Sequence, residues 1–270
     1  LSQEVCALRG SRLAFAAILA DGSVRTWGDK DHGGDSSAVR RQLKKVQQMS
    51  MSYGACSAVC SDGRVVTWGA AEFGGDSSSV SGGLCDVSTV CSTAAAFAAL
   101  RGDGSVVTWG DAAAGGDSRC VQHQLRGVRS LHATCSAFAA IRVDGTVVAW
   151  GDADSGGDTE KVQNQLFDVQ EIASACDAFA ALRADGRAVS WGDAGRGGDH
   201  GPVDGQLRDL RSVRASATAF AALRLDGRVV SWGDAGHGGD CSEVEDQLHE
   251  IQELPSGCVG FGPEASSCNM

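Results

Sequence analysis

A fixed period of 41 residues constrains the fold of this chain more than any other feature. The pair Asp-Gly occurs six times at this spacing, from Asp21-Gly22 to Asp226-Gly227. The pair Trp-Gly does the same from Trp27 to Trp232, so all six tryptophans occupy one repeat position. A period between 20 and 50 residues is typical of solenoids, propellers and other repeat arrays. We therefore expect the tryptophans to be structural.

Each repeat contains two short apolar runs on either side of its Asp-Gly pair. Residues 219–232 read A-F-A-A-L-R-L-D-G-R-V-V-S-W. Two such runs joined by Asp-Gly predict a β-hairpin, because glycine tolerates the positive φ of a tight hairpin turn. The apolar pair three residues apart that opens each repeat, such as Val5 and Leu8, predicts a further strand. The S-x-x-V-x-x-Q-L stretch that closes the repeat fits either a helical turn or an outer edge strand.

The alanines of the A-F-A-A-L run conflict with a strand assignment, because alanine has poor strand propensity. The conflict disappears if this strand lies where several sheets converge and only small side chains fit. We therefore expect it to be the inner strand of a radial array.

These elements predict an all-β fold, a β-propeller in which each 41-residue repeat forms one blade. The expected single domain covers residues 1–270, with seven blades of which the last is incomplete. The seventh repeat keeps Ile251, Leu254 and Phe261 but has lost the Asp-Gly pair, whose position is held by Ser267-Cys268. Six blades with an extra closing hairpin is the alternative. The repeats are expected near residues 5–45, 46–86, 87–127, 128–168, 169–209, 210–250 and, in part, 251–270.

The chain is acidic, with a formal net charge of −11 and a pI near 4.9. A surface of that sign repels phosphate backbones, so we expect no direct nucleic-acid partner. No apolar run approaches the length of a membrane helix, although the protein could be peripheral to a membrane assembly. The sequence begins at Leu1 without a signal segment, which leaves two compartments open. One is an organelle, after removal of a targeting peptide, and the other is the cytoplasm.

The eleven cysteines cannot all be paired, because their number is odd. Cys135, Cys176 and Cys258 share one repeat position, and the others are scattered. No C-x-x-C motif or zinc-type spacing is present, so we expect no metal and no cofactor. The cysteines are expected to be thiols in a tight core. The alternative is one or two disulfides between near neighbours, such as Cys56 with Cys60 or Cys85 with Cys91.

The motifs V-x-x-L-x-A, A-F-A-A-L-R-x-D-G-x-V-V-x-W-G-D and G-G-D-S resemble the repeats of the regulator of chromosome condensation family. The resemblance covers nearly the whole chain and implies a seven-bladed propeller. It implies little about function, because such propellers include a nucleotide exchanger, ubiquitin-ligase domains, an ultraviolet photoreceptor and a β-lactamase inhibitor protein. The repeat length is nearer to that of the inhibitor. The chain lacks the exchanger's inserted wedge and the photoreceptor's G-W-R-H-T motif.

Two sets of residues are candidates for contacts with a partner. The first precedes the Asp-Gly turns and would form an incomplete basic ring facing a channel; alternatively, each arginine pairs with an aspartate of its own or the neighbouring turn. The second set lies where the repeats differ most, between Trp-Gly-Asp and Gly-Gly-Asp, because divergent loops on a rigid scaffold often carry specificity. The first set is Arg101, Arg142, Arg183 and Arg224; the second is His32, Phe73, Arg196 and His237.

The aspartates that flank these divergent residues recur in the repeats. A calcium loop places several oxygen ligands at short alternating spacings, whereas each loop here has only one or two. We therefore expect the aspartates to cap the Gly-Gly turn. They are Asp29, Asp111, Asp152, Asp193 and Asp234, then Asp35, Asp76, Asp117, Asp158, Asp199 and Asp240.

The sequence shows no catalytic constellation: no nucleophile–base arrangement, no pair of carboxylates in unlike environments and no phosphate-binding loop. It therefore predicts a non-enzymatic scaffold for protein–protein interaction, acting as an adaptor or as a peripheral subunit of a larger complex. The alternatives are a guanine-nucleotide exchange factor for a small GTPase and a ligand-binding or catalytic site in the central channel.

Overall fold

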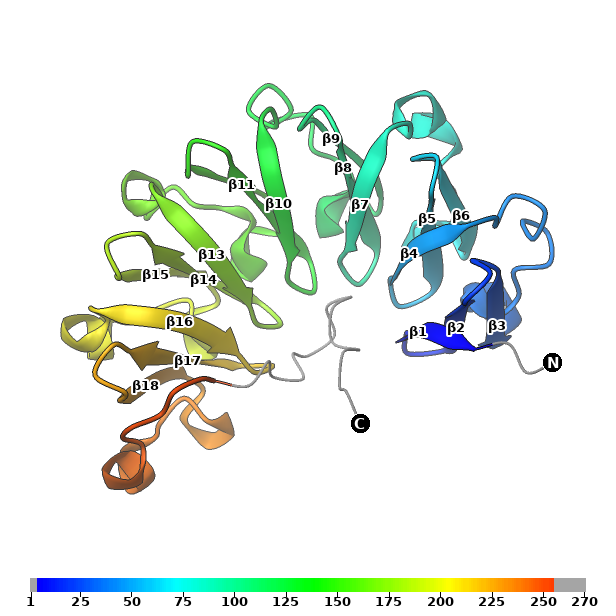
Figure 1. Ribbon diagram of the computed structural model, residues 1–270. Coiled ribbons are helices and arrows are strands. Elements are labelled where there is room, and N and C mark those ends of the chain that lie inside the picture. The colour runs from blue at the N-terminus through cyan, green and yellow to red at the C-terminus, as the bar shows by residue number, and fades with distance from the viewer. Residues whose placement is uncertain (1–3, 255–270) are drawn as a thin grey trace. The chain divides into compact units, whose positions relative to one another are not determined.

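The computed structural model describes residues 4–254. Three-stranded sheets and short helical turns alternate along this part of the chain (Figure 1). The chain falls into two compact units, one ending at Leu131 and one beginning at His132. Each unit is built from the same repeat, and the expectation of a single domain over residues 1–270 stays a prediction.

The strands form six sheets, each with its three strands in chain order. The first three sheets are β1 (Val5–Gly10), β2 (Ala14–Leu19) and β3 (Val24–Gly28); β4 (Val46–Met51), β5 (Ala55–Cys60) and β6 (Val65–Gly69); and β7 (Val87–Ser92), β8 (Ala96–Arg101) and β9 (Val106–Gly110). The other three are β10 (Val128–Ala133), β11 (Ala137–Arg142) and β12 (Val147–Gly151); β13 (Val169–Ser174), β14 (Ala178–Arg183) and β15 (Ala188–Gly192); and β16 (Leu210–Ala215), β17 (Ala219–Arg224) and β18 (Val229–Gly233). Six propeller blades are therefore present in the described chain.

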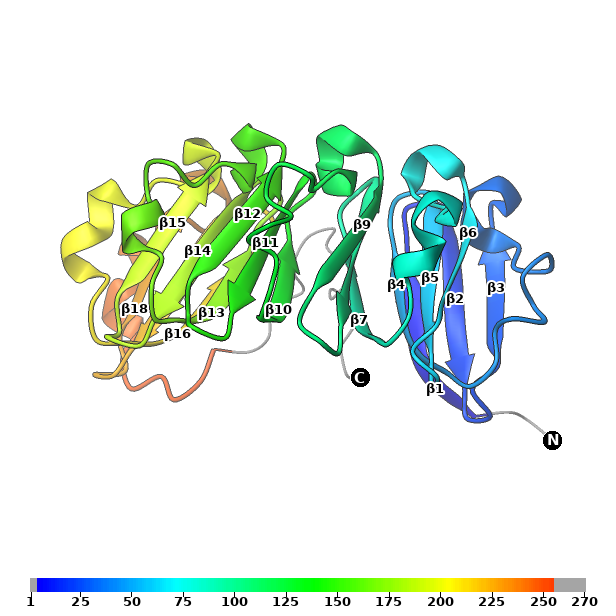
Figure 2. The ribbon, with the colours of Figure 1, turned by 90° about the horizontal axis from the view of Figure 1, so that it is seen from above.

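Short helical turns follow the third strand of every sheet, at the ends of the strands opposite the Asp-Gly turns (Figure 2). The S-x-x-V-x-x-Q-L stretch thus forms a helical turn and not an outer strand. Its leucine anchors the turn, and Leu125 and Leu166 are almost fully buried. The helical turns are η1 (Lys30–Gly34), η2 (Ala71–Phe73), η3 (Ser78–Gly83), η4 (Ala112–Gly116), η5 (Ala153–Gly157), η6 (Gln163–Gln165), η7 (Ala194–Arg196), η8 (Gly201–Gln206), η9 (Ala235–His237) and η10 (Ser242–Gln247).

The glycine of each Asp-Gly turn also packs against the backbone of the residues that begin the next repeat. Gly22 has a φ of +75°, and a Cβ there would lie 2.6 Å from the Cα of Lys45. The amide of Val46 then donates to the carbonyl of Gly22 at 2.9 Å. Only glycine satisfies both the turn and this close approach.

The seventh repeat begins in the same way, because Ile251 donates its amide to the carbonyl of Gly227 at 3.1 Å. Phe261 and the Ser267-Cys268 position, on which the expected partial blade depends, lie outside the described residues. The six blades are therefore followed by the start of another repeat.

The A-F-A-A-L run forms the middle strand of each sheet, so its predicted place as an inner strand is wrong. The alanines are required for a different reason: both faces of the strand are buried against neighbouring sheets. On β14, Phe179 and Ala181 pack in the core shared with β11, while Ala178 and Ala180 pack in the core shared with β17. A small residue on one sheet leaves room for the phenylalanine of the next.

The phenylalanine of this middle strand lies directly opposite the tryptophan of the third strand. Phe179 and Trp191 form such a cross-strand pair, with stacked rings whose centroids are 5.2 Å apart. The Trp191 indole also donates to the carbonyl of Gly156 in the preceding repeat at 2.9 Å. The same bond is made by Trp68, Trp109 and Trp232. Each of these four tryptophans therefore joins its own sheet to the loop of the sheet before it.

The nine described cysteines are thiols, as predicted, but only Cys56, Cys60, Cys91 and Cys176 lie in the core, and Cys6, Cys85 and Cys120 are exposed. Cys56 and Cys60 both lie on β5, four residues apart. Strand geometry separates such residues by about 13 Å, too far for a disulfide. Burial raises the pKa of the Cys56 thiol to about 12.

Candidate functional site

The residues between Trp-Gly and Gly-Gly-Asp form the tips of the loops, at the ends of the sheets opposite the Asp-Gly turns. We call residues 30–32, 71–73, 112–114, 153–155, 194–196 and 235–237 the tips. Their sequences differ from repeat to repeat, whereas the strands around them barely change. The third residue of each tip is His32, Phe73, Ala114, Ser155, Arg196 or His237.

Hydrogen bonds hold the backbone of the tips in place. In the fourth repeat, the carboxylate of Asp152 accepts from the amide of Ser155 at 2.8 Å. The hydroxyl of Thr134 donates to the carbonyl of the same residue at 3.0 Å. Asp29, Asp111, Asp193 and Asp234 cap their own tips in the same manner. In the second repeat the cap position is Ala70 and no side chain caps the tip. In the other five repeats, similarly capped backbones present varying side chains.

The aspartate that ends each Gly-Gly-Asp loop is also a cap, although it caps the turn that follows it and not the Gly-Gly turn as predicted. Asp158 accepts from the amide of Glu160 at 2.8 Å, and the corresponding aspartates make the same bond two residues along the chain. Within residues 4–254 no group of three or more His, Cys, Asp or Glu side chains is arranged to hold a metal ion.

In the unit that ends at Leu131, the first two tips meet over one glycine. The rings of His32 and Phe73 have their centroids 6.1 Å apart and are tilted by 57°. Both lie over Gly54, where a Cβ would come within 2.8 Å of each ring. The His32 ring is 2.8 Å from the Asp29 carboxylate, and this hydrogen bond lowers the pKa of Asp29. Two of the four predicted tip residues therefore form one aromatic surface.

In the unit that begins at His132, the tips of the fourth and fifth repeats meet at Asp177. The Ser155 hydroxyl donates to one carboxylate oxygen at 3.1 Å, and the Arg196 guanidinium pairs with the other. The Arg196 side chain remains 44% exposed, so its charge is available at the surface. Asp177 therefore occupies the place that Gly54 has in the other unit.

His237 lies at the last described tip. Its ring is 2.8 Å from Asp234, and this hydrogen bond lowers the pKa of the Asp234 carboxyl. The positive charge of Arg196 acts in the same direction. The histidine side chain is 74% exposed. The structure thus places all four predicted tip residues in the expected loops, while a role in binding stays a prediction.

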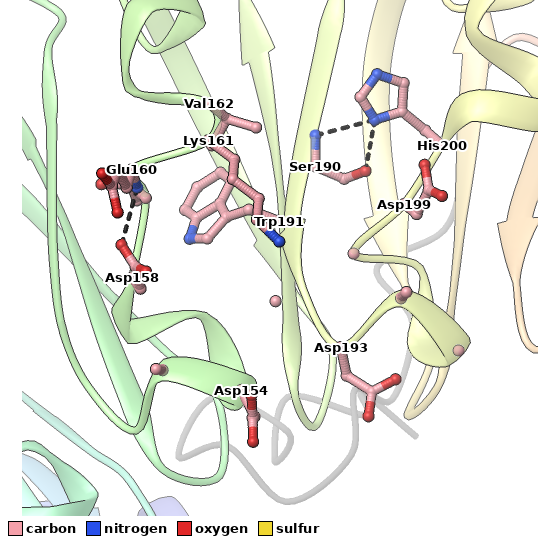
Figure 3. A pocket seen from close by; sticks show the side chains of 16 residues that line it. Asp154, Asp158, Glu160, Lys161, Val162, Ser190, Trp191, Asp193, Asp199 and His200 are labelled. Atoms are coloured by element: carbon pink, nitrogen blue, oxygen red, sulfur yellow. Dashed lines mark hydrogen bonds between the residues drawn. The ribbon is translucent and has the colours of Figure 1, made fainter.

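A pocket of about 720 Å³ lies beside the tips of the fourth and fifth repeats (Figure 3). Its walls are the loop from Ala153 to Val162 and the segment from Ser190 to His200. Lys161 is the one Lys or Arg side chain that lines it. Five carboxylates line the pocket: Asp154, Asp158, Glu160, Asp193 and Asp199.

His200 shapes one wall of this pocket through a hydrogen bond of 2.7 Å to the Ser190 hydroxyl. The first three repeats have a Thr–Ser pair at these two positions, such as Thr26 with Ser36 at 3.0 Å. A larger imidazole therefore replaces a hydroxyl where the pocket forms. Sequence analysis missed His200 and Asp177, although both stand out when the repeats are aligned on one another.

The four arginines before the Asp-Gly turns are engaged with their own turns. Arg183 lies 2.9 Å from Asp185 and covers the ring of Phe167, with its guanidinium carbon 3.8 Å from the ring centroid. Arg101, Arg142 and Arg224 pair with the aspartates of their turns in the same way. These are the ion pairs of the alternative interpretation, and a contact of these arginines with a partner stays a prediction.

Comparison with known proteins places this repeat among solved propellers. No protein-family model matches the sequence, and no curated protein matches it. Among solved structures, Prp20p from Saccharomyces cerevisiae is 17% identical, with a TM-score of 0.53 over 85% of this chain and 72% of its own. Another crystal structure identifies Prp20 as yeast RCC1.

The chain has an RCC1-like β-propeller fold. Human WBSCR16 is also similar, at 16% identity and a TM-score of 0.56 over 86% of this chain and 77% of its own. The ectodomain of the receptor kinase CR4 from Physcomitrella patens is 13% identical, with a TM-score of 0.51 over 86% of this chain and 62% of its own. At these identities the RCC1-like similarity concerns the fold alone. None of the helices in residues 4–254 has the length and apolarity that a membrane span requires.

Proposed function

We propose that this chain is a non-enzymatic protein-interaction module that contacts its partner through the tips. The observation that carries the proposal is a tip backbone that aspartate caps hold in five of the six repeats, combined with tip side chains that vary between repeats. A rigid scaffold with divergent loops is how many proteins separate stability from specificity. The protein would act as an adaptor or as a peripheral subunit of a larger complex.

The pocket beside the fourth and fifth tips defines the chemistry of one contact. Five carboxylates and a single lysine line it, and the whole chain carries a net charge of −11. Opposite charge across an interface speeds encounter and selects the partner. The pocket therefore suits a segment of the partner that is rich in lysine and arginine.

One protein of the same fold class, described in two structures, supports a role in binding proteins. The structure of Prp20p is described together with its binding properties to Gsp1p and histones, and another structure shows yeast RCC1 bound to Kap60. These are properties of that protein. They make protein binding a reasonable use of this fold and name no partner for this chain.

The test is cross-linking mass spectrometry on native extract with two charge-reversed variants. The first carries Asp154→Lys and Glu160→Lys, both exposed in the pocket loop. The control carries Glu243→Lys and Glu245→Lys, which make the same charge change in the loop of the sixth repeat. We expect a partner at fixed stoichiometry, cross-linked to the tips through lysine-rich segments, and lost only with the first variant.

Equal retention of the partner by both variants would contradict the role of the pocket. A chain that remains without a partner in every extract would contradict the proposal as a whole. The exchange-factor alternative predicts instead that the chain accelerates nucleotide release from a small GTPase, and that assay is run with the same two variants.

A further inference from the structure

The connection between the first and second strands of each repeat carries one position that is repeated every 41 residues. It is occupied by Arg12, Tyr53, Ala94, Cys135, Cys176 and Ala217. Within the described chain, only the fourth and fifth repeats have cysteine at this position. These two cysteines can be close in space only if equivalent positions of neighbouring repeats lie next to each other.

A backbone hydrogen bond joins this position in successive repeats. The amide of Cys135 donates to the carbonyl of Cys176 at 2.7 Å. The amide of Cys176 donates in turn to the carbonyl of Ala217 at 2.8 Å, and Tyr53 donates to Ala94 at 2.8 Å. The fold itself thus brings equivalent residues of neighbouring repeats side by side.

This bond brings the two cysteines within disulfide range. The path from the Cys135 Cα through its amide nitrogen and the 2.7 Å hydrogen bond to the Cys176 carbonyl oxygen and Cα sets an upper limit on the separation of the two Cα atoms. With standard bond lengths this limit is about 6.6 Å. Natural disulfides join Cα atoms about 4.4–6.8 Å apart. The side chains also face each other, because the Cys135 and Cys176 thiols are hydrogen-bonded. Both are thiols in this structure.

The surroundings activate one of the two sulfurs. The hydrogen bond from Cys135 lowers the pKa of the Cys176 thiol to about 7, and the Arg196 guanidinium acts in the same direction. Burial and the neighbouring Asp177 carboxylate oppose this shift. The thiolate is the nucleophilic form of cysteine. Cys176 is 8% exposed and Cys135 is half-buried, so a small oxidant suits the site.

We propose that Cys135 and Cys176 form a reversible oxidation site, at which hydrogen peroxide converts the two thiols into a disulfide. The Cys176 thiolate attacks one peroxide oxygen, the O–O bond breaks, and the leaving hydroxide takes a proton to become water. The Cys135 sulfur then attacks the resulting sulfenic acid. The S–S bond forms, the S–O bond breaks, and the Cys135 proton leaves with the hydroxyl group as a second water. The two thiols are oxidised while hydrogen peroxide is reduced to two waters.

The disulfide would join the fourth and fifth repeats beside their tips. Asp177 follows Cys176 directly and holds Ser155 and Arg196. Oxidation therefore acts next to the proposed contact surface, although the site does not depend on that proposal. Reduction by a dithiol restores both thiols.

The test uses the full chain, treated with hydrogen peroxide, blocked with N-ethylmaleimide and digested with trypsin without reduction. Cleavage after Arg129, Arg142, Lys161 and Arg183 gives peptides 130–142 and 162–183, each with a single cysteine. We expect these peptides to be linked to each other, and the link to be lost after dithiothreitol. The exposed thiols of Cys85 and Cys120 are internal controls. A linked pair that forms no faster than random pairs with these controls would overturn the proposal.

Two variants separate chemistry from geometry. In Cys135→Ser, the serine hydroxyl can still donate to Cys176, so we expect dimedone to trap a sulfenic acid on peptide 162–183. The second variant combines Cys135→Ser with Ala217→Cys and moves the pair one repeat along. Peptides 162–183 and 215–224 should then become linked. A moved pair that stays reduced while the exposed controls are oxidised would overturn the geometric argument.

Discussion

Replacing Phe179 by alanine tests whether the cores between neighbouring sheets hold the repeats together. Phe179 is fully buried against the preceding sheet, whereas Phe15 occupies the same position of the first repeat and is 46% exposed. The two stack on their own tryptophans almost equally, with centroids 5.2 and 5.5 Å apart. Phe15→Ala is therefore a matched control that differs only in the covering sheet.

The expected magnitudes follow from burial. A buried phenylalanine replaced by alanine costs about 3–5 kcal/mol of the free energy of unfolding, because apolar contact is lost and a cavity remains. Full burial of a large apolar side chain contributes about 1.5–3 kcal/mol to the free energy of unfolding. Phe15 is only half-buried and its removal leaves no cavity, so replacing it by alanine should cost about 1 kcal/mol. We expect a difference of about 2–4 kcal/mol.

The assay is equilibrium urea unfolding followed by circular dichroism, with hydrogen exchange of the β11 and β14 amides as a local readout. Stability in repeat proteins is roughly a sum over repeats and their interfaces. Phe179→Ala should therefore lower protection around the fourth and fifth sheets first. Equal losses for the two variants would refute the claim that the inter-sheet core dominates.

Three further outcomes are expected. Gly197 has a φ of +94°, and a Cβ there would come within 2.6 Å of the Phe220 ring; alanine should therefore destabilise by more than the roughly 1–2 kcal/mol of backbone strain alone, and a smaller loss of unfolding free energy in the urea assay would contradict this. Trp109→Phe leaves a buried glycine carbonyl without its indole donor and should cost about 1–3 kcal/mol in the same assay, whereas Trp27→Phe, at an indole that no preceding repeat covers in the described chain, should cost much less. The hydrogen bond with Arg119 lowers the pKa of Asp117 from 3.8 to about 2; this stabilisation is complete above pH 4 and is lost as the pH falls towards 2, so urea midpoints should decrease over that window, and a midpoint that rises on acidification would count against it.

Much of the fold was predictable because the same short-range sequence signals for turns and strands occur in six repeats. The Asp-Gly turns, the aspartate caps of the tips and the cross-strand hairpins depend on residues close in sequence, and all were predicted. The place of the A-F-A-A-L strand was predicted wrongly. Its alanines are explained by burial on both faces, and burial depends on neighbouring sheets that a single repeat cannot reveal.

The candidate site was predictable only in part. The differing tips led to His32, Phe73, Arg196 and His237, which lie in the expected loops, while their predicted contact with a partner stays a prediction. Asp177 was missed because it lies on a different loop, before the hairpin that ends at the tip. Its partner Ser155 belongs to the preceding repeat, so the contact appears only when repeats are placed next to one another.

The indole–carbonyl bond between repeats always runs from a later repeat, which supplies the donor, to an earlier repeat, which supplies the acceptor. Each of four tryptophans bonds to a glycine 35 residues earlier, in the repeat that has already been made. During synthesis on the ribosome, a repeat that emerges therefore finds its acceptor loop already outside the exit tunnel. Domains fold in this order, with the N-terminal part first. A nascent chain of this kind can fold one blade at a time. At any moment, the apolar surface that is still exposed to solvent is then about that of one repeat.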